Sequence, residues 1–172
     1  MADYTKAIKI DPNFAYAFNG RGNTYKDSKD YYKALADYTT AIQIDPKDSY
    51  AYNGRGSTHK ELKNYKFALS DFQSALSFSP NNPLYLILIA ICCDELGERN
   101  LFTESLAKCE QLLSSKDPTQ IQTDFNISQP NTDFIRSELS RLKAKATTAL
   151  WFWVWLLILL YLLNPYQLNN DC

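Results

Sequence analysis

"AFNGRGNTYKDSKDYYKAL", residues 17–35, and "AYNGRGSTHKELKNYKFAL", residues 51–69, are two versions of one sequence. Aligned without a gap, they are identical at 11 of 19 positions and begin 34 residues apart. The glycines and alanines return to the same places, whereas many charged residues differ. Self-similarity at this period predicts a solenoid in which each unit buries its apolar face against its neighbours.

The same register extends in both directions along the chain, and the spacing within a unit is helical. Phe18, Gly22 and Tyr25 lie at i, i+4 and i+7, so they share one face of a helix, and the small Gly22 lets another helix approach closely. A second apolar stripe ends at Pro46, because the residue before a proline avoids the helical region. Each unit is therefore predicted to be a helical hairpin. Residues in register are Tyr4, Tyr38 and Phe72; Ala7, Ala41 and Ala75; and Pro12, Pro46 and Pro80.

This pattern resembles the tetratricopeptide repeat family, whose unit carries a large, a small and an aromatic residue on its first helix and alanine, an aromatic residue, alanine and proline on its second. The resemblance covers residues 1 to about 115 and implies an all-α, right-handed superhelical solenoid of helical hairpins. Seven positions match in each of two consecutive units: Phe18, Gly22, Tyr25, Ala34, Tyr38, Ala41 and Pro46, and then Tyr52, Gly56, His59, Ala68, Phe72, Ala75 and Pro80.

The array divides into unequal parts. Its first segment corresponds to the second helix of an incomplete repeat, which indicates a truncated array or, alternatively, a short capping helix. The third full unit is degenerate, since Cys93 replaces the aromatic residue and Phe102 stands where alanine is expected. The expected divisions are 1–14 for the incomplete repeat, 15–48 and 49–82 for the two matching repeats, and 83–115 for the degenerate repeat.

The composition argues against several classes of function. With 18 basic and 19 acidic residues, the net charge of −1 lacks the basic patch of a nucleic-acid-binding protein. Four scattered cysteines and one histidine provide no metal site, and no cofactor motif is present. His59 occupies an aromatic packing position, and the "GRG" at residues 20–22 follows no strand, so neither indicates catalysis. We expect no enzyme activity and no small-molecule substrate.

The resemblance implies a concave groove, lined by the first helix of each unit, that holds a peptide or a helix of a partner protein. Asparagine suits such a surface, because each amide both donates and accepts hydrogen bonds. A merely solvated face is the alternative. The groove positions carried over by register are Tyr16, Asn19, Asn23 and Lys26 in one unit, Tyr50, Asn53, Ser57 and Lys60 in the next, and Leu84, Ile87 and Ile91 in the third.

One subtype of the family clamps the C-terminal carboxylate of cytosolic chaperones. Asn23 matches a clamp position, but Asn19 stands where lysine is expected and Gly54 where asparagine is expected. Leu84 and Leu88 occupy positions where basic residues are expected. A chaperone tail is therefore disfavoured as the ligand.

The third unit begins with "PLYLILIAICC", residues 83–93, which is apolar on every side, although a helix with a solvated face should carry only an apolar stripe. Either the C-terminal segment of the chain or a partner must cover it. After a linker predicted at 116–130, an amphipathic helix is expected at 131–147, with Ile135, Leu139 and Leu142 on one face.

A hydrophobic helix at 148–164 is predicted to anchor the chain in a membrane. Its 15-residue apolar core, Ala149 to Leu163, spans about 22 Å as a helix against about 30 Å of hydrocarbon. Four basic residues precede the core and none follows, so the repeats should face the cytosol, and the short span favours the endoplasmic reticulum. The alternatives are a buried or oligomerising helix, which would leave the chain cytoplasmic, or a tail that is not native.

Together these features predict a non-enzymatic adaptor that binds a segment of a partner protein and is tethered to a membrane by its C-terminus. The rival hypothesis is a truncated regulatory or targeting arm of a larger multidomain protein, such as an enzyme.

Overall fold

The structure, a computed structural model, describes residues 1–114, 116, 120 and 129–162; in the last helix it describes the side chains of residues 131–149, 152 and 154. The regular structure in this part of the chain is entirely helical, with no strand. Its helices are α1 (Ala2–Ile10), α2 (Ala15–Asp27), α3 (Tyr31–Ile44), α4 (Ser49–Glu61), α5 (Tyr65–Phe78), α6 (Pro83–Leu96), α7 (Arg99–Leu113) and α9 (Gln129–Leu162).

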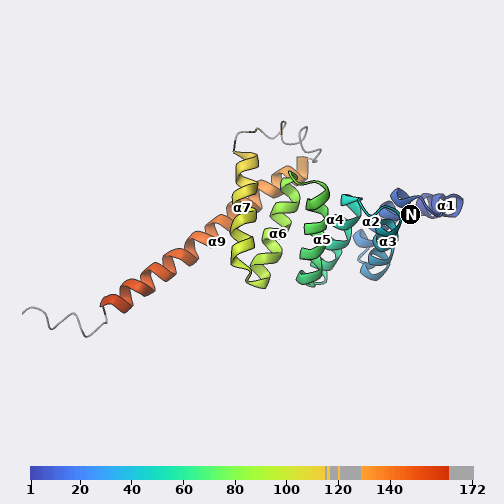
Figure 1. Ribbon diagram of the computed structural model, residues 1–172. Helices are drawn as coiled ribbons and strands as arrows, with labels where there is room; N and C mark the ends of the chain where they lie inside the picture. Colours follow the sequence, from blue (N-terminus) through green and yellow to red (C-terminus); the bar gives the residue numbers. More distant parts are fainter. Residues whose placement is uncertain (115, 117–119, 121–128, 163–172) are drawn as a thin grey trace, which may run out of the picture.

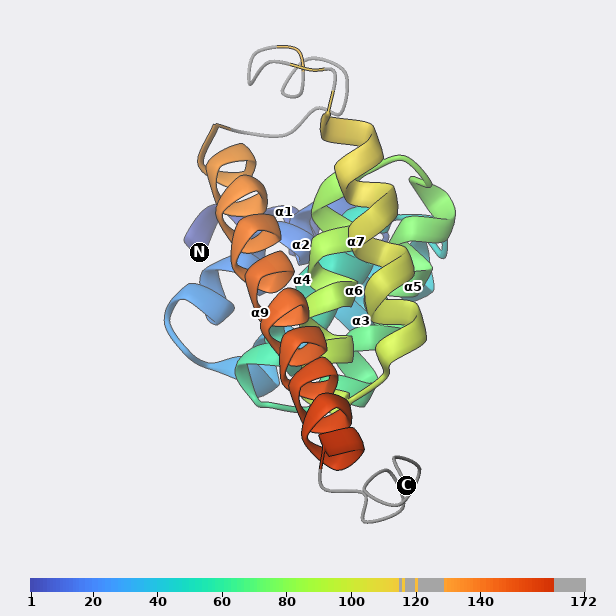
Figure 2. The same cartoon turned by 90° about the vertical axis from the view of Figure 1, so that its left-hand side faces the viewer.

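The helices form hairpins that stack side by side in an extended array (Figure 1). Helix α2 packs on α3, α4 on α5 and α6 on α7, and successive hairpins meet where α3 contacts α4 and α5 contacts α6. Helix α1 packs on α2 at one end of the array, while α9 packs on α6 and α7 at the other end and then runs beyond it (Figures 1 and 2). The predicted all-α array of helical hairpins is confirmed.

The helix ends recur with the 34-residue register. Each hairpin turns at a residue in the left-handed conformation: Lys29 at φ 62°, Lys63 at φ 58° and Gly97 at φ 75°. Only glycine adopts this conformation without a steric cost, so the two lysines are held there by the surrounding hairpin. Asp48 and Asn82, also 34 residues apart, cap α4 and α6 by accepting backbone hydrogen bonds from the first turn.

An aromatic ring from the second helix of each matching hairpin fits against glycine on a first helix. The Tyr38 ring is 1% exposed and lies against Gly22 of its own hairpin and Gly54 of the next. A Cβ atom at Gly22 would lie 3.0 Å from Tyr38 Cε1, and one at Gly54 would overlap the ring. Phe72 repeats the arrangement, since a Cβ atom at Gly56 would lie 2.9 Å from Phe72 Cε1. These glycines are needed because the rings occupy the space of a side chain.

A buried ion pair joins the two helices of each matching hairpin. Arg21 donates two hydrogen bonds of 2.7 Å to the carboxylate of Asp37. Arg55 and Asp71 repeat this pair at 3.0 and 2.7 Å, and both aspartate side chains are less than 9% exposed. Because removing one partner would leave a buried charge, the pair restricts how the two helices cross.

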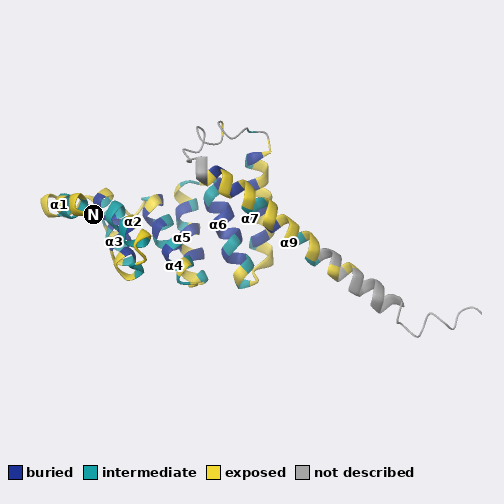
Figure 3. Cartoon of the chain, turned by 180° about the vertical axis from the view of Figure 1, so that it is seen from behind, coloured by how far each residue is buried: buried dark blue, intermediate teal, exposed yellow. Residues whose placement is uncertain are grey.

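The third hairpin is the most buried part of the described chain, with buried residues along nearly all of α6 (Figure 3). Its core extends from Ala68 and Phe72 of α5 through α6 and α7 to Ile135 and Leu142 of α9. Helix α6 can therefore be apolar on every side, because α5, α7 and α9 each cover part of it. Of the two covers predicted for residues 83–93, the structure provides the C-terminal segment of the chain itself.

The C-terminal region differs from the expected division into two helices, 131–147 and 148–164. Helix α9 is continuous from Gln129 to Leu162, since no glycine or proline interrupts residues 131–162. Of the linker predicted at 116–130, the structure describes residues 116, 120, 129 and 130, and the last two belong to α9. Residues 163–164 and most side chains of the predicted anchor lie outside the described residues. Among the described residues, no helix is sufficiently long and apolar to cross a membrane.

The Gly54→Ala substitution tests the packing of the aromatic ring. At an exposed helical site, replacing glycine with alanine stabilises by up to about 1 kcal/mol. Here we expect a loss of about 1–3 kcal/mol instead, because the new methyl group overlaps Tyr38. Urea denaturation of Gly54→Ala, alone and combined with Tyr38→Leu, measures this loss. The penalty should shrink in the double variant, and a stabilising Gly54→Ala would contradict the packing described.

Candidate functional site

The predicted groove residues lie on α2, α4 and α6, the first helices of the three hairpins. Tyr16 and Tyr50 are the most exposed of them, at 67% and 62%, and Asn23 is also exposed. Asn19, Lys26, Asn53, Ser57, Lys60, Leu84 and Ile91 are half-buried. Ile87 is fully buried, which corrects its assignment as a groove position, because a ligand cannot reach it while α9 is docked.

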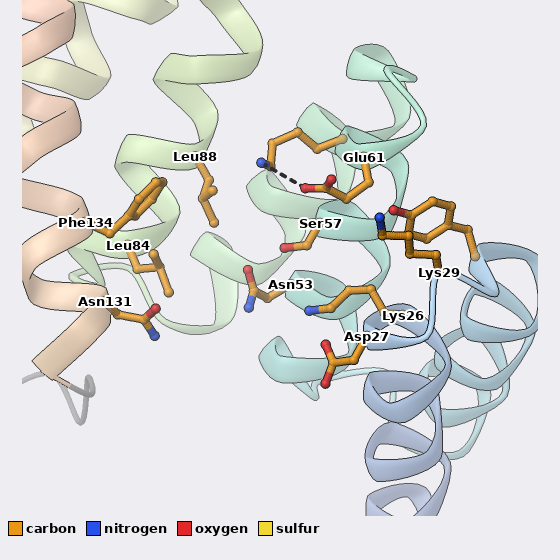
Figure 4. A pocket seen from close by; sticks show the side chains of 12 residues that line it. Lys26, Asp27, Lys29, Asn53, Ser57, Glu61, Leu84, Leu88, Asn131 and Phe134 are labelled. Carbon is orange, nitrogen blue, oxygen red and sulfur yellow. Dashed lines mark hydrogen bonds and ion pairs between the residues drawn. The ribbon is translucent and has the colours of Figure 1, made fainter. Parts of the chain in front are cut away.

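Five of the eleven predicted residues meet in one pocket of about 520 Å³: Lys26, Asn53, Ser57, Lys60 and Leu84 (Figure 4). The pocket lies between the first helices of the matching repeats and the beginning of α9. Seven further residues complete its lining, and of these the sequence singled out only Leu88, as a position of the carboxylate clamp: Asp27, Lys29, Tyr31, Glu61, Leu88, Asn131 and Phe134. Asn131 and Phe134 come from α9, outside the repeats, so the register could not have found them.

The pocket has two chemically different sides. Leu84, Leu88 and Phe134 gather on one side and form an apolar wall from α6 and α9 (Figure 4). Asn53 and Ser57 of α4 face this wall, with Lys26 of α2 beside them (Figure 4). The pocket can therefore bury an apolar group against one side while the other side makes hydrogen bonds to a polar or acidic group.

The side chains of the three groove asparagines differ in their hydrogen bonding. The Asn23 side-chain oxygen accepts a 2.6 Å hydrogen bond from the Tyr38 hydroxyl, and the Asn19 amide donates to Asp48. The side-chain oxygens of Asn19 and Asn53 are buried and have no hydrogen-bond partner among the described residues. A buried polar atom without a partner lowers the stability of the fold. A ligand that hydrogen-bonds the Asn53 side chain, which lines the pocket, removes this cost.

Helix α9 closes the groove at the third hairpin. Ile135 and Leu142 are fully buried in the core around α6, and Leu139 and Ala146 pack beside them. Lys145 Nζ lies 2.6 Å from Asp94 Oδ2 of α6, whose side chain is 4% exposed. Lys143 forms a second ion pair with Glu110 of α7. The register of this apolar stripe directs Phe134, which is 37% exposed, toward the pocket rather than into the core.

The groups that could carry chemistry elsewhere lie in structural positions. His59 stacks on Phe67 at 5.3 Å between ring centroids, and burial lowers its pKa. Burial raises the pKa of the Cys92 and Cys109 thiols to about 12, so both are protonated at neutral pH. No group of three or more potential metal ligands occurs in the described part of the chain.

This geometry defines a helical repeat protein with a groove along its first helices. Residues 15–48 and 49–82 each match a family model of the tetratricopeptide repeat. The chain therefore carries two tetratricopeptide repeats. No curated protein sequence matches it.

Solved structures with the same fold have low sequence identity to this chain. "MamA RS-1 ArsTM double mutant" is 14% identical over 83% of both chains, with a TM-score of 0.61. "CopN-Scc3 complex" is 17% identical over 71% of this chain and 72% of that one, with a TM-score of 0.60. "Second TPR of Spaghetti (RPAP3) bound to HSP90 peptide SRMEEVD" is 19% identical over 57% of this chain and 91% of that one, with a TM-score of 0.55. At these identities the likeness establishes the fold alone.

The Ile135→Ala substitution tests whether α9 is part of the folded array. We expect it to lower the free energy of unfolding by about 2–5 kcal/mol, because it leaves a cavity in the core around α6. Phe134→Ala, one residue away but facing the pocket, should cost less and serves as the control. Chemical denaturation and amide hydrogen exchange of α6 measure both effects. Equal losses in the two variants would mean that α9 does not dock as described.

Proposed function

We propose that this protein is a non-enzymatic interaction module that binds a short segment of a partner protein in the pocket between α2, α4 and α9. One observation carries the proposal: in a pocket of about 520 Å³, the polar side around Asn53 faces the apolar wall of Leu84, Leu88 and Phe134. A peptide matches both sides, since its backbone donates and accepts hydrogen bonds while its side chains supply apolar groups. The two tetratricopeptide repeats at residues 15–48 and 49–82 support this function.

The walls of the pocket also specify the ligand. Lys26 favours an acidic or backbone carbonyl group on the polar side, where Lys60 already pairs with Glu61 at 3.5 Å. The apolar wall favours one aliphatic or aromatic side chain opposite it. The neighbour of known structure named above holds the acidic peptide SRMEEVD. In this chain, Leu84 and Leu88 occupy positions where a carboxylate clamp requires basic residues, so we infer a ligand with fewer acidic groups and one apolar anchor.

The second part of the proposal places this groove on a membrane. The apolar run from Ala149 to Leu163 begins within α9, which the structure describes through Leu162, and Arg136, Arg141, Lys143 and Lys145 precede it. If the run enters a bilayer, the positive-inside rule keeps the repeats on the cytosolic side. Because α9 is one continuous helix through Leu162, the groove would then stand at a short, fixed distance from the membrane surface.

A triple substitution of pocket residues, Lys26→Ala, Asn53→Ala and Ser57→Ala, tests the binding function. Peptides selected from a displayed random library against the full-length chain serve as the probe. We expect the triple variant to weaken their binding by at least tenfold, because each lost hydrogen bond contributes about 1 kcal/mol. Fluorescence polarisation measures the affinity.

The matched control changes exposed polar residues on α5, Lys66→Ala with Ser70→Ala, and should leave the affinity unchanged. Circular dichroism verifies that both variants fold. Selected peptides that bind the triple variant and the wild type equally would show that the ligand docks elsewhere.

Truncation of residues 149–172 tests the membrane proposal separately. We expect the full chain to remain with membranes after carbonate extraction and the truncated chain to be released, because the truncation removes the apolar run but keeps the docked part of α9. Fractionation of cells expressing each form gives the measurement. A full chain that is soluble and monodisperse without detergent would contradict the anchor while leaving the groove proposal intact.

A further inference from the structure

The ion pair that joins the helices of the matching repeats is replaced in the third hairpin. In the second repeat, the Arg55 guanidinium pairs with Asp71 of α5 and also donates a 3.4 Å hydrogen bond to Thr39 of α3. Its side chain therefore fills the space where three helices meet: α3, α4 and α5. The charged head and the long aliphatic stem both contribute to this packing.

The positions in register, 34 residues later, carry Ile89 for the arginine, Ser105 for the aspartate and Gln73 for the threonine. Ile89 is 1% exposed and Ser105 is 3% exposed, so both are buried, whereas of their counterparts Asp71 is buried and the Arg55 side chain is 22% exposed. Isoleucine is shorter than arginine, and serine is smaller than aspartate. The third hairpin therefore lacks the volume of the guanidinium and of the carboxylate that holds it.

A pocket of about 380 Å³ lies between α5, α6 and α7 at this place. It is lined by all three substituted positions, Gln73, Ile89 and Ser105. The remaining lining is mainly apolar and shares no residue with the groove pocket: Leu76, Ser77, Pro80, Leu86, Leu101, Glu104 and Lys108. A concave, mainly apolar pocket of this size with a few polar groups is typical of small-molecule sites.

The Ser105 hydroxyl is the polar group inside this pocket. Its side chain is almost fully buried and lines the pocket. Gln73, Glu104 and Lys108 are exposed and lie at the pocket rim. A ligand that fills the apolar space can therefore also hydrogen-bond the Ser105 hydroxyl, which gives the site one polar contact among apolar ones.

We propose that the pocket between α5, α6 and α7 binds a small apolar molecule of one or two rings that carries a single hydroxyl or carbonyl group. The rings occupy the space that the Arg55 side chain fills in the preceding repeat, packed on Leu86, Ile89 and Leu101. The polar group reaches the Ser105 hydroxyl, which donates to a carbonyl or accepts from a hydroxyl. This site is independent of the proposed peptide groove.

A titration of the full-length chain with 2-naphthol, which has two fused rings and one hydroxyl, tests the site. We expect saturable shifts in the methyl NMR resonances of Leu86, Ile89 and Leu101. Ser105→Ala should weaken the binding by about fivefold, since it removes one hydrogen bond. Shifts that do not saturate, or an affinity that Ser105→Ala leaves unchanged, would overturn the proposal.

The ion pair of the second repeat suggests a variant that fills and blocks this pocket. Ile89→Arg combined with Ser105→Asp restores the ion pair of the second repeat and should abolish saturable binding while the helices remain folded. Ser105→Leu fills the pocket without charge and gives the same test if the double variant does not fold. Lys26→Ala with Asn53→Ala, in the groove, is the control and should bind 2-naphthol as the wild type does. Binding that persists in both filled variants would place 2-naphthol outside this pocket.

Discussion

The array depends on a close approach between an aromatic ring and the backbone of a neighbouring helix. The Tyr38 ring packs against Gly22 of its own hairpin and Gly54 of the next, so one side chain sets the separation of three helices. Hydrophobic burial alone is non-directional and would allow the helices to slide past one another. A ring that fits only where two glycines face it fixes both the register of the helices and the spacing of the hairpins. That spacing also determines the shape of the groove on α2 and α4.

The third hairpin lacks this packing of an aromatic ring against glycines. Leu88 stands in register with Gly54, and Ala90 with Gly56, so the positions that receive a ring in the matching repeats carry side chains instead. The hairpin compensates by apolar burial on all sides of α6, which requires a cover that no further repeat in this chain supplies. Helix α9 is that cover, held by Ile135 and Leu142 and by the ion pair from Lys145 to Asp94. The same helix places Asn131 and Phe134 at the pocket.

The docking of α9 thus links stability to the shape of the ligand site. A groove lined only by repeats would continue over α6, where Ile87 was expected to face a ligand. Because Ile87 is buried and α9 packs on α6, the pocket opens over the two matching repeats and ends at an apolar wall from α6 and α9. The family resemblance by itself implied a concave groove along three first helices, with apolar residues on the third, whereas the structure shows a shorter pocket with two unlike sides.

The sequence by itself determined the helical hairpins, their bounds to within a few residues and the contacts of Gly22 and Gly56, because local helical spacing and the 34-residue period record them directly. It also predicted that residues 83–93 need a cover and that Ile135, Leu139 and Leu142 share one face. Only the tertiary structure decided that these two surfaces meet, that Ile87 is inaccessible and that Phe134 lines the pocket. The contact between α6 and α9 joins residues about 50 positions apart and occurs once, so no repeat encodes it. It follows from the fit of two whole surfaces, which depends on the packing of every helix between them.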